Sequence, residues 1–150
     1  MNIYYSDIAT SIQSTINGQS TQLVAGNKLC GQIVVARAAF STKSTMLAGD
    51  MIQLFRLPKG AVIIPHLSLF SSDTLVATNL VITLGDQGDP ARYSYELDIA
   101  KQGYHQLEGG KQALKPSEIG ESTWITATII TATSVTENKK IMAWIAYTLP

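Results

Sequence analysis

The sequence predicts an all-β fold, an antiparallel β-sandwich that is jelly-roll-like and carries an extended polar N-terminal arm. Three observations favour this fold: short runs rich in Val, Ile, Thr and aromatic residues, turn residues about every ten positions, and alternation of apolar and polar side chains within several runs. With 150 residues, 45% of them hydrophobic, the chain is long enough for a single domain with a full core.

Residues 1–30 are predicted to form the arm, and residues 31–150 the sandwich domain. The arm is rich in Ser, Thr, Gln and Asn, and its isoleucines recur at spacings of four or five, which also fits a weak amphipathic helix. Its glycines and β-branched residues favour an extended chain. We expect the arm to pack on a neighbouring protein through Tyr4, Tyr5 and Ile8, and a loose tail is the alternative.

Seven or eight strands fit the domain better than any helical scheme. The apolar runs are, in order, QIVVARAAF (32–40), DMIQLFRL (50–57), AVIIPHLSLF (61–70), NLVITL (79–84), ARYSYELDI (91–99), WITATIITAT (124–133) and KIMAWIAYTL (140–149).

Alternation predicts which faces of these strands are buried. In the fifth run, one face is expected to carry Tyr93, Tyr95, Leu97 and Ile99, and the other Arg92, Ser94, Glu96 and Asp98. In the sixth, the threonines alternate with a set of apolar residues expected to face the core, namely Ile125, Ala127 and Ile129. The last run is apolar on both faces, which predicts a strand covered on both sides, with a sister subunit as one possible cover.

Two turns follow from their residues. LPKGA at 57–61 places Pro58 and Gly60 as a tight reversal between strands requires. VTENKK at 135–140 predicts a hairpin between the last two strands, with Glu137 and Asn138 at its tip.

The string LGDQGDPARY at 84–93 poses a choice between a metal site, a phosphate site and a turn. Asp86 and Asp89 are weak candidates for a hard cation, because Ca²⁺ takes about six to eight oxygen ligands. A phosphate loop opens a helix, and this string does not. The turn is favoured: Asp caps its own backbone, Gly88 supplies a positive φ, and Pro90 ends pairing.

The balance of charge argues against several partners. Eleven basic and eleven acidic residues cancel, and charged residues make up 15% of the chain, against about 25% in typical soluble domains. We therefore do not expect the protein to bind nucleic acid. No apolar stretch approaches the length of a membrane span. The N-terminus lacks the pattern of a secretory signal, so we expect synthesis in a cytoplasm.

Nothing in the sequence indicates catalysis. His66 and His105 lack the spacing of a zinc site, and no nucleophile elbow is present. For the single cysteine, Cys30, the role of a small apolar residue is favoured over that of a reactive thiol. A carboxylate pair for glycoside cleavage remains open in principle. Its candidates are Asp73, Asp86, Asp98 and Glu121. We expect a protein that is not an enzyme and needs no cofactor or metal.

Aromatic and arginine side chains provide the contact candidates. Trp124 and Trp144, with Tyr93 and Tyr95, fit either a sugar-binding platform or packing in the core and between subunits, and the strand context favours packing. Arg37 and Arg56, each inside an apolar run, fit interface salt bridges and solvated positions equally well. Arg37, Arg56 and Trp144 are therefore predicted contacts with a sister subunit or with another protein.

Two strings, GDMIQLFRLPKGAVIIPHLSLF and NLVITLGDQGDPARYSY, resemble the capsid cement or decoration proteins of short-tailed bacteriophages. The resemblance covers residues 49–95 and extends more loosely to Tyr147. It implies a jelly-roll-like sandwich that forms a homotrimer, binds the outer surface of the phage head and bridges major capsid subunits, after synthesis in the host bacterial cytoplasm. The alternative is a receptor-binding or carbohydrate-binding sandwich of the tail-fibre type.

Overall fold

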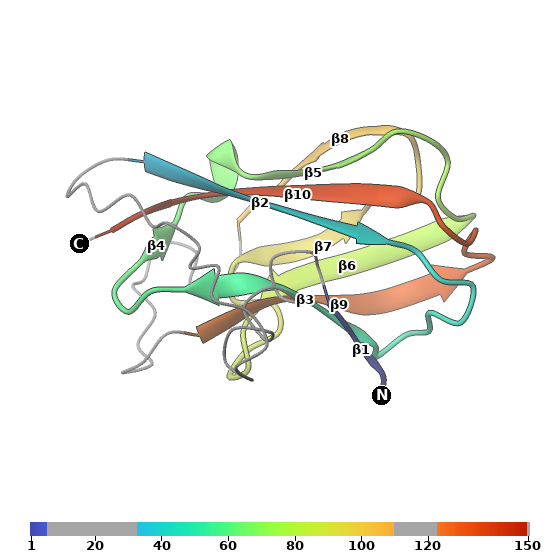
Figure 1. Ribbon diagram of the computed structural model, residues 1–150, viewed down its shortest axis with the longest axis horizontal. Coiled ribbons are helices and arrows are strands. Elements are labelled where there is room, and N and C mark those ends of the chain that lie inside the picture. Colours follow the sequence, from blue (N-terminus) through green and yellow to red (C-terminus); the bar gives the residue numbers. More distant parts are fainter. Residues whose placement is uncertain (6–32, 110–122, 150) are drawn as a thin grey trace, which may run out of the picture.

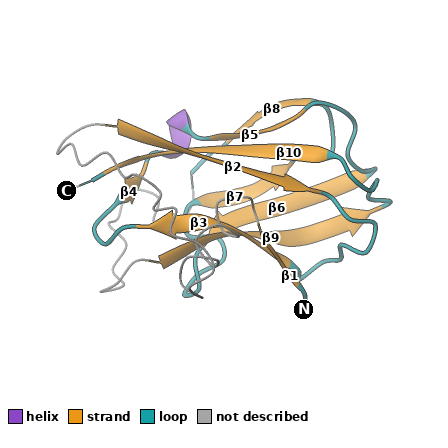
Figure 2. Ribbon diagram, in the orientation of Figure 1, coloured by secondary structure: helices purple, strands orange, loops and turns teal. Residues whose placement is uncertain are grey.

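The computed structural model describes residues 1–5, 33–109 and 123–149 (Figure 1). Two β-sheets stack face to face, and apart from a single 3₁₀ turn, η1 (Pro65–Leu67), the described elements are strands (Figure 2). The predicted antiparallel sandwich is confirmed. Of the predicted arm, residues 3–5 form a strand, while residues 6–32, with Ile8 and Cys30, lie outside the described residues.

Each sheet is named here by its strands. Sheet A has the order β1 (Ile3–Tyr5), β3 (Met51–Leu57), β9 (Thr123–Thr133), β6 (Asn79–Gly85), β7 (Ser94–Asp98). Sheet B has the order β2 (Ile33–Ser41), β10 (Lys140–Thr148), β5 (Leu69–Ser72), β8 (Gly103–Gln106), and the short β4 (Val62–Ile63) also pairs with β10. All these pairs are antiparallel except β1 with β3, which is parallel.

The core lies between the sheets and is built by period-two alternation. In β9 the predicted inward set is confirmed, since Ile125, Ala127 and Ile129 are at most 1% exposed. Inward residues of β10 face them from the other sheet, and Ile141 and Ile145 are fully buried. Each large apolar side chain that is buried in this way contributes about 1.5–3 kcal/mol to folding.

The position of β10 accounts for its apolar sequence. The strand lies inside sheet B, between β2 and β5. Its inner face belongs to the core, while Met142 and Trp144 on its outer face are half-buried beside β2. The cover on that outer face comes in part from Arg37 of the same chain.

The run at 61–70 is not one strand, which corrects the prediction. It divides into β4, η1 and the start of β5, because Pro65 has no N–H to give to a sheet and begins the 3₁₀ turn instead. Ser68 then ties the turn to β10. Its buried hydroxyl donates to Ile64 O at 2.8 Å and accepts from Ala146 N at 2.9 Å.

The predicted face of the fifth run is wrong at Tyr95. Leu84 pairs with Ser94 and Ile82 with Leu97, so two residues of β7 oppose the single Thr83 of β6. This β-bulge breaks the alternation. Tyr95 is therefore 53% exposed, whereas Tyr93 and Ile99 are buried as predicted. Ser94, predicted on the opposite face, is buried as well.

Both predicted turns join the strands that the sequence predicts, but in each case the two strands belong to different sheets. At 57–61, Ala61 N donates to Pro58 O at 3.1 Å and Gly60 has φ 78°, yet the chain passes from β3 in sheet A to β4 in sheet B. The predicted hairpin at 135–140 is wrong, because β9 and β10 belong to different sheets. Asn138 N bonds to Thr42 O at 2.8 Å in this crossover.

Candidate functional site

The loop between β6 and β7 is organised around the buried side chain of Asp86. Its Oδ1 accepts from Gly88 N at 2.9 Å and from Asp89 N at 3.1 Å. Its Oδ2 accepts from the Tyr93 hydroxyl at 2.8 Å and forms an ion pair with Arg92 Nε at 2.7 Å. The predicted role of Asp86 in capping its own backbone is confirmed, and the same carboxylate also closes the far end of the loop.

Both oxygens of Asp86 are thus engaged by donors of the loop itself. Asp89 turns its Oδ1 to Ala91 N at 2.9 Å, so the two predicted cation candidates serve separate backbone contacts. Among the described residues no group of three or more His, Cys, Asp or Glu side chains is placed to hold a metal ion. The geometry favours the turn over a cation site.

Backbone space in this loop is tightest at Gly85. A Cβ atom there would lie 2.1 Å from Asp89 O and 2.3 Å from the Pro90 carbonyl carbon, so only glycine fits. The prediction that Gly88 adopts a positive φ is wrong, because the described glycines with positive φ are Gly49, Gly60, Gly103 and Gly109. Asp86 bonds the Gly88 N–H without requiring a left-handed backbone there.

The environment of Tyr93 changes its acidity. Burial raises the pKa of the hydroxyl, and the hydrogen bond to the Asp86 carboxylate raises it further, since ionised tyrosine would place two negative charges together. Tyr93 is 1% exposed, which agrees with the favoured packing interpretation and removes Tyr93 from the alternative sugar platform. Tyr93 belongs to the core, whereas Tyr95 lies on the surface.

Each sheet carries one arginine–tryptophan pair at paired positions of two neighbouring strands. In sheet B, Arg37 of β2 lies opposite Trp144 of β10, with Cζ 5.1 Å from the ring centroid. In sheet A, Arg56 of β3 lies opposite Trp124 of β9 at 5.7 Å. The structure therefore brings the predicted contact residues Arg37 and Trp144 together and places Arg56 on the other sheet.

The outer surface of sheet B is apolar around the Arg37–Trp144 pair. On β2, Ile33 and Val35 are each 53% exposed, and Arg37 is exposed beside them. Arg37 Nη2 also points to Met142 Sδ at 3.5 Å. Exposed apolar side chains next to an ordered arginine are typical of protein contact surfaces.

Asp50 is a structural residue that the sequence analysis did not single out. Its buried carboxylate accepts from Asn2 N at 2.8 Å and from Leu47 N at 3.1 Å, which fastens the start of β1 beside β3. The Asn2 hydrogen bond is the main cause that lowers the pKa of Asp50, although burial opposes it. Only a contact between distant segments could have revealed this role.

The predicted arm residues that the structure describes are involved in contacts within the chain. Tyr4 is half-buried against the core, its ring lies 5.5 Å from Lys43 Nζ, and its hydroxyl is 3.4 Å from Thr45 Oγ1. Tyr5 is the last residue of β1, where its backbone pairs with Gln53.

The two histidines make separate hydrogen bonds. His105 Nε2 donates to Lys101 O at 3.0 Å, and the backbone oxygen of His66 accepts from Gln106 Nε2.

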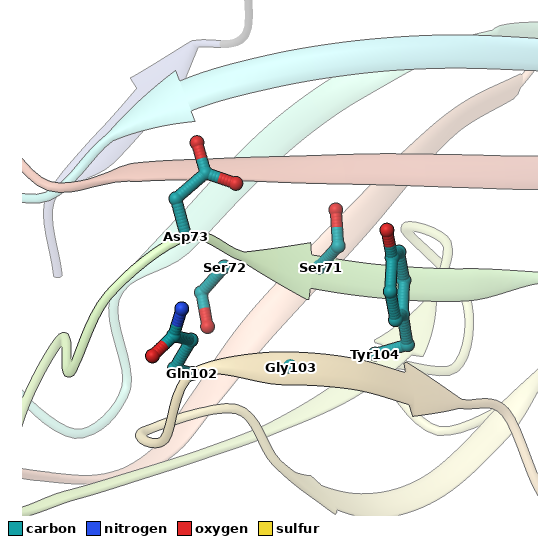
Figure 3. A pocket seen from close by; sticks show the side chains of 6 residues that line it. All are labelled: Ser71, Ser72, Asp73, Gln102, Gly103 and Tyr104. Carbon is teal, nitrogen blue, oxygen red and sulfur yellow. The ribbon is translucent and has the colours of Figure 1, made fainter.

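A shallow polar depression lies where β5 and β8 meet, and Figure 3 shows its lining. Its volume is about 250 Å³. Tyr104 is 82% exposed at its rim, and its ring is directed to the same side of the strands as Ser71 and Asp73 (Figure 3). The lining residues are Ser71, Ser72, Asp73, Gln102, Gly103 and Tyr104.

These features describe a β-sandwich in which the buried carboxylates of Asp50 and Asp86 hold backbone segments together. No helix among the described residues is long and apolar enough to cross a membrane. No protein-family model and no curated protein sequence matches the chain.

Two solved structures share the fold. One is a chain of the capsid asymmetric unit of cyanophage Pam1, with a TM-score of 0.63 and 19% identity over 89% of this chain and 96% of that one. The other belongs to the capsid of Ralstonia phage GP4, with a TM-score of 0.73 and 16% identity over 99% of this chain and 98% of that one. The chain is thus similar in fold to proteins found in phage capsids.

Proposed function

We propose that this chain is a virion structural protein, a cement or decoration protein that binds the outside of an assembled phage head and bridges its major capsid subunits. The observation that carries the proposal is the match of nearly the whole chain, 99%, to a chain of the Ralstonia phage GP4 capsid. That likeness covers both chains almost end to end.

The site geometry supports a structural role and not an enzymatic one. The ion pair between Asp86 and Arg92 stabilises the loop between β6 and β7, and Asp86 also accepts backbone hydrogen bonds of that loop. The contact surface around Arg37 and Trp144 is apolar and ordered, as binding to another protein requires.

Cement action has a simple physical basis. A protein that binds the assembled lattice and not the dissociated subunits stabilises the lattice by mass action. A homotrimer offers three copies of each contact, and effective concentration makes modest single contacts add. The proposal therefore includes self-association as a trimer on the capsid surface, with synthesis in the cytoplasm of the host bacterium.

Co-sedimentation with phage heads tests the proposal. Heads that lack the protein are incubated with the purified chain and pelleted, and dissociated major capsid protein serves as the matched control. We expect the chain to pellet with heads, to leave dissociated subunits unbound, and to raise the temperature at which heads release DNA. Binding to neither, or equal binding to both, contradicts the cement role.

Carbohydrate binding, as in a tail-fibre type receptor module, is the second candidate, and the polar depression favours it. Trp124 and Trp144 each have an arginine over the ring, which leaves Tyr104 as the exposed aromatic beside hydroxyl, amide and carboxylate groups. An exposed ring beside such groups suits a sugar. A glycan array tests it, with Tyr104→Ala expected to lose a hit that Trp144→Ala keeps; an array without hits rejects it.

A further inference from the structure

Charged residues are segregated along the described chain, although the whole sequence is neutral. From Ile33 to Ile63 there are four basic residues and one acid, Asp50. From Ile64 to Gly109 there are six acids and two basic residues, Arg92 and Lys101. A neutral total therefore conceals two consecutive segments of opposite net charge, 33–63 and 64–109.

The sheet topology converts this separation into two opposite edges. The first segment supplies β2 and β3, and these strands, with β1, lie at one side of the two sheets. The second segment supplies β7 and β8, which end the two sheets at the other side. We name these the β2 edge and the β7–β8 edge.

The β2 edge combines positive charge with exposed apolar side chains. Arg37 and Lys43 are exposed. Arg37 lies over the ring of Trp144 in the neighbouring strand β10, and Lys43 lies over the ring of Tyr4 in β1. Ile33 and Val35 are each 53% exposed on the same strand as Arg37. The one acid of this segment, Asp50, is buried and bonded to backbone, so it does not offset the surface charge.

The β7–β8 edge has the complementary composition. Glu96 and Glu108 are exposed, and so is Asp98, whose Oδ1 accepts from Ala100 N at 2.9 Å. The β-bulge turns Tyr95 outward beside Glu96, which gives this edge an exposed apolar surface as well. Lys101 between β7 and β8 is the basic residue exposed here, because Arg92 is paired with buried Asp86.

We propose that copies of this chain join head to tail, with the β2 edge of one copy against the β7–β8 edge of the next, in a closed ring. The apolar residues Ile33, Val35 and Tyr95 supply burial, while the opposed charges set the orientation. A contact between two different patches of one chain is heterologous, and it closes as a ring when the rotation from copy to copy returns to the first copy. A two-fold contact would instead place each edge against its own like charges.

The inference deepens the proposed function, on which it rests for the number of copies, by naming the surfaces that join them. Reversal of charge at one edge and then at both tests it. The β2-edge variant is Arg37→Glu with Lys43→Glu, and the β7–β8-edge variant is Glu96→Lys with Glu108→Lys. Asp98 is left unchanged because its carboxylate accepts a backbone hydrogen bond.

Light scattering after size-exclusion chromatography gives the molar mass of each variant. We expect the native chain to be a trimer, each single-edge variant to be a monomer, and the variant with both edges reversed to recover the trimer. Recovery is the decisive result, since it requires that the two edges face each other. Glu137→Lys is the matched control, a charge reversal on the exposed β9–β10 crossover, and is expected to stay trimeric.

A monomeric native chain, an oligomer indifferent to the single-edge changes, or a both-edge variant that stays dissociated overturns the inference. Circular dichroism at each step shows that a monomer is folded. Capsid binding is measured separately on the native chain. A native monomer that still pellets with heads rejects the ring and leaves the cement role intact. A trimer that depends on the edge charges but does not pellet with heads supports the ring and rejects the cement role.

Discussion

The Tyr93 hydroxyl donates a 2.8 Å hydrogen bond to Oδ2 of Asp86, seven residues earlier in the chain, and both side chains are buried. Arg92 meets the same oxygen at 2.7 Å, so one carboxylate holds the last turn of the loop at two points. Residues 84–93, which suggest a ligand site in the sequence, contain the loop that connects β6 to β7 in the structure.

Replacement of Asp86 by asparagine is expected to lower the free energy of unfolding by about 2–4 kcal/mol, because it leaves Arg92 as a partly buried charge without its partner. Urea unfolding followed by tryptophan fluorescence measures the loss. Asp89→Asn is the control, since Asp89 accepts a single backbone hydrogen bond, from Ala91, through its side chain, and is expected to cost under about 1 kcal/mol. Equal losses for the two variants would contradict the central role of Asp86.

Gly85→Ala is expected to destabilise the protein by about 3 kcal/mol or to prevent folding, because the new methyl group meets the Asp89 carbonyl oxygen at 2.1 Å. Gly88→Ala in the same loop meets the end of the Arg92 side chain at 3.2 Å and Asp86 Oδ1 at 3.4 Å, and is expected to cost about 1 kcal/mol at most. Thermal unfolding of both variants decides the matter. A Gly85 variant as stable as the Gly88 variant rejects the predicted clash.

Acid is expected to loosen β1 through Asp50. The pKa of this carboxyl is lowered in the fold, chiefly by the Asn2 N–H, so the unfolded chain binds the proton first and stability falls as pH drops below about 4. The stabilisation is complete above that pH. Unfolding free energies between pH 2 and pH 6, compared with those of Asp50→Asn, isolate this contribution: the variant starts lower and shows a shallower slope. Parallel curves would exclude it.

Ser68→Ala is expected to cost about 1–3 kcal/mol, because it leaves the buried Ala146 N–H without its acceptor and removes the link from η1 to β10. Ser71→Ala, three residues later in β5 at the polar depression, is the control, and is expected to change stability by less than about 0.5 kcal/mol. Denaturant midpoints at constant slope provide the comparison. A harmless Ser68 variant would show that the Ala146 N–H finds another partner.

The sequence predicts the strands well wherever period and burial agree. Thr126 and Thr128 alternate with Ile125 and Ile129 because one face of β9 is in the core, and the structure places them so. β8 is missed because GYHQ is polar and begins with glycine, and its pairing with β5 alone makes it a strand. Tyr95 is misplaced because the bulge depends on the register against β6.

The candidate site shows the same division. Asp86, Arg37 and Trp144 stand out in the sequence by residue type, but their partners do not. Arg37 reaches Met142, which is 105 residues away in sequence, and pairs with Trp144 only because β2 and β10 are neighbours in sheet B. Likewise, the 135–140 turn is legible, whereas its passage from one sheet to the other depends on tertiary packing.

The place of β10 inside sheet B also governs how the molecule is made. β2 and β5 flank this strand, which is the last of the described strands to leave the ribosome. Until then β2 has no partner in its sheet, and its apolar side chains are open to other nascent chains. We therefore expect folding to be slow and to follow translation, because it depends on pairings between distant segments. We also expect a premature stop before Lys140 to give an aggregation-prone product in place of a shortened domain.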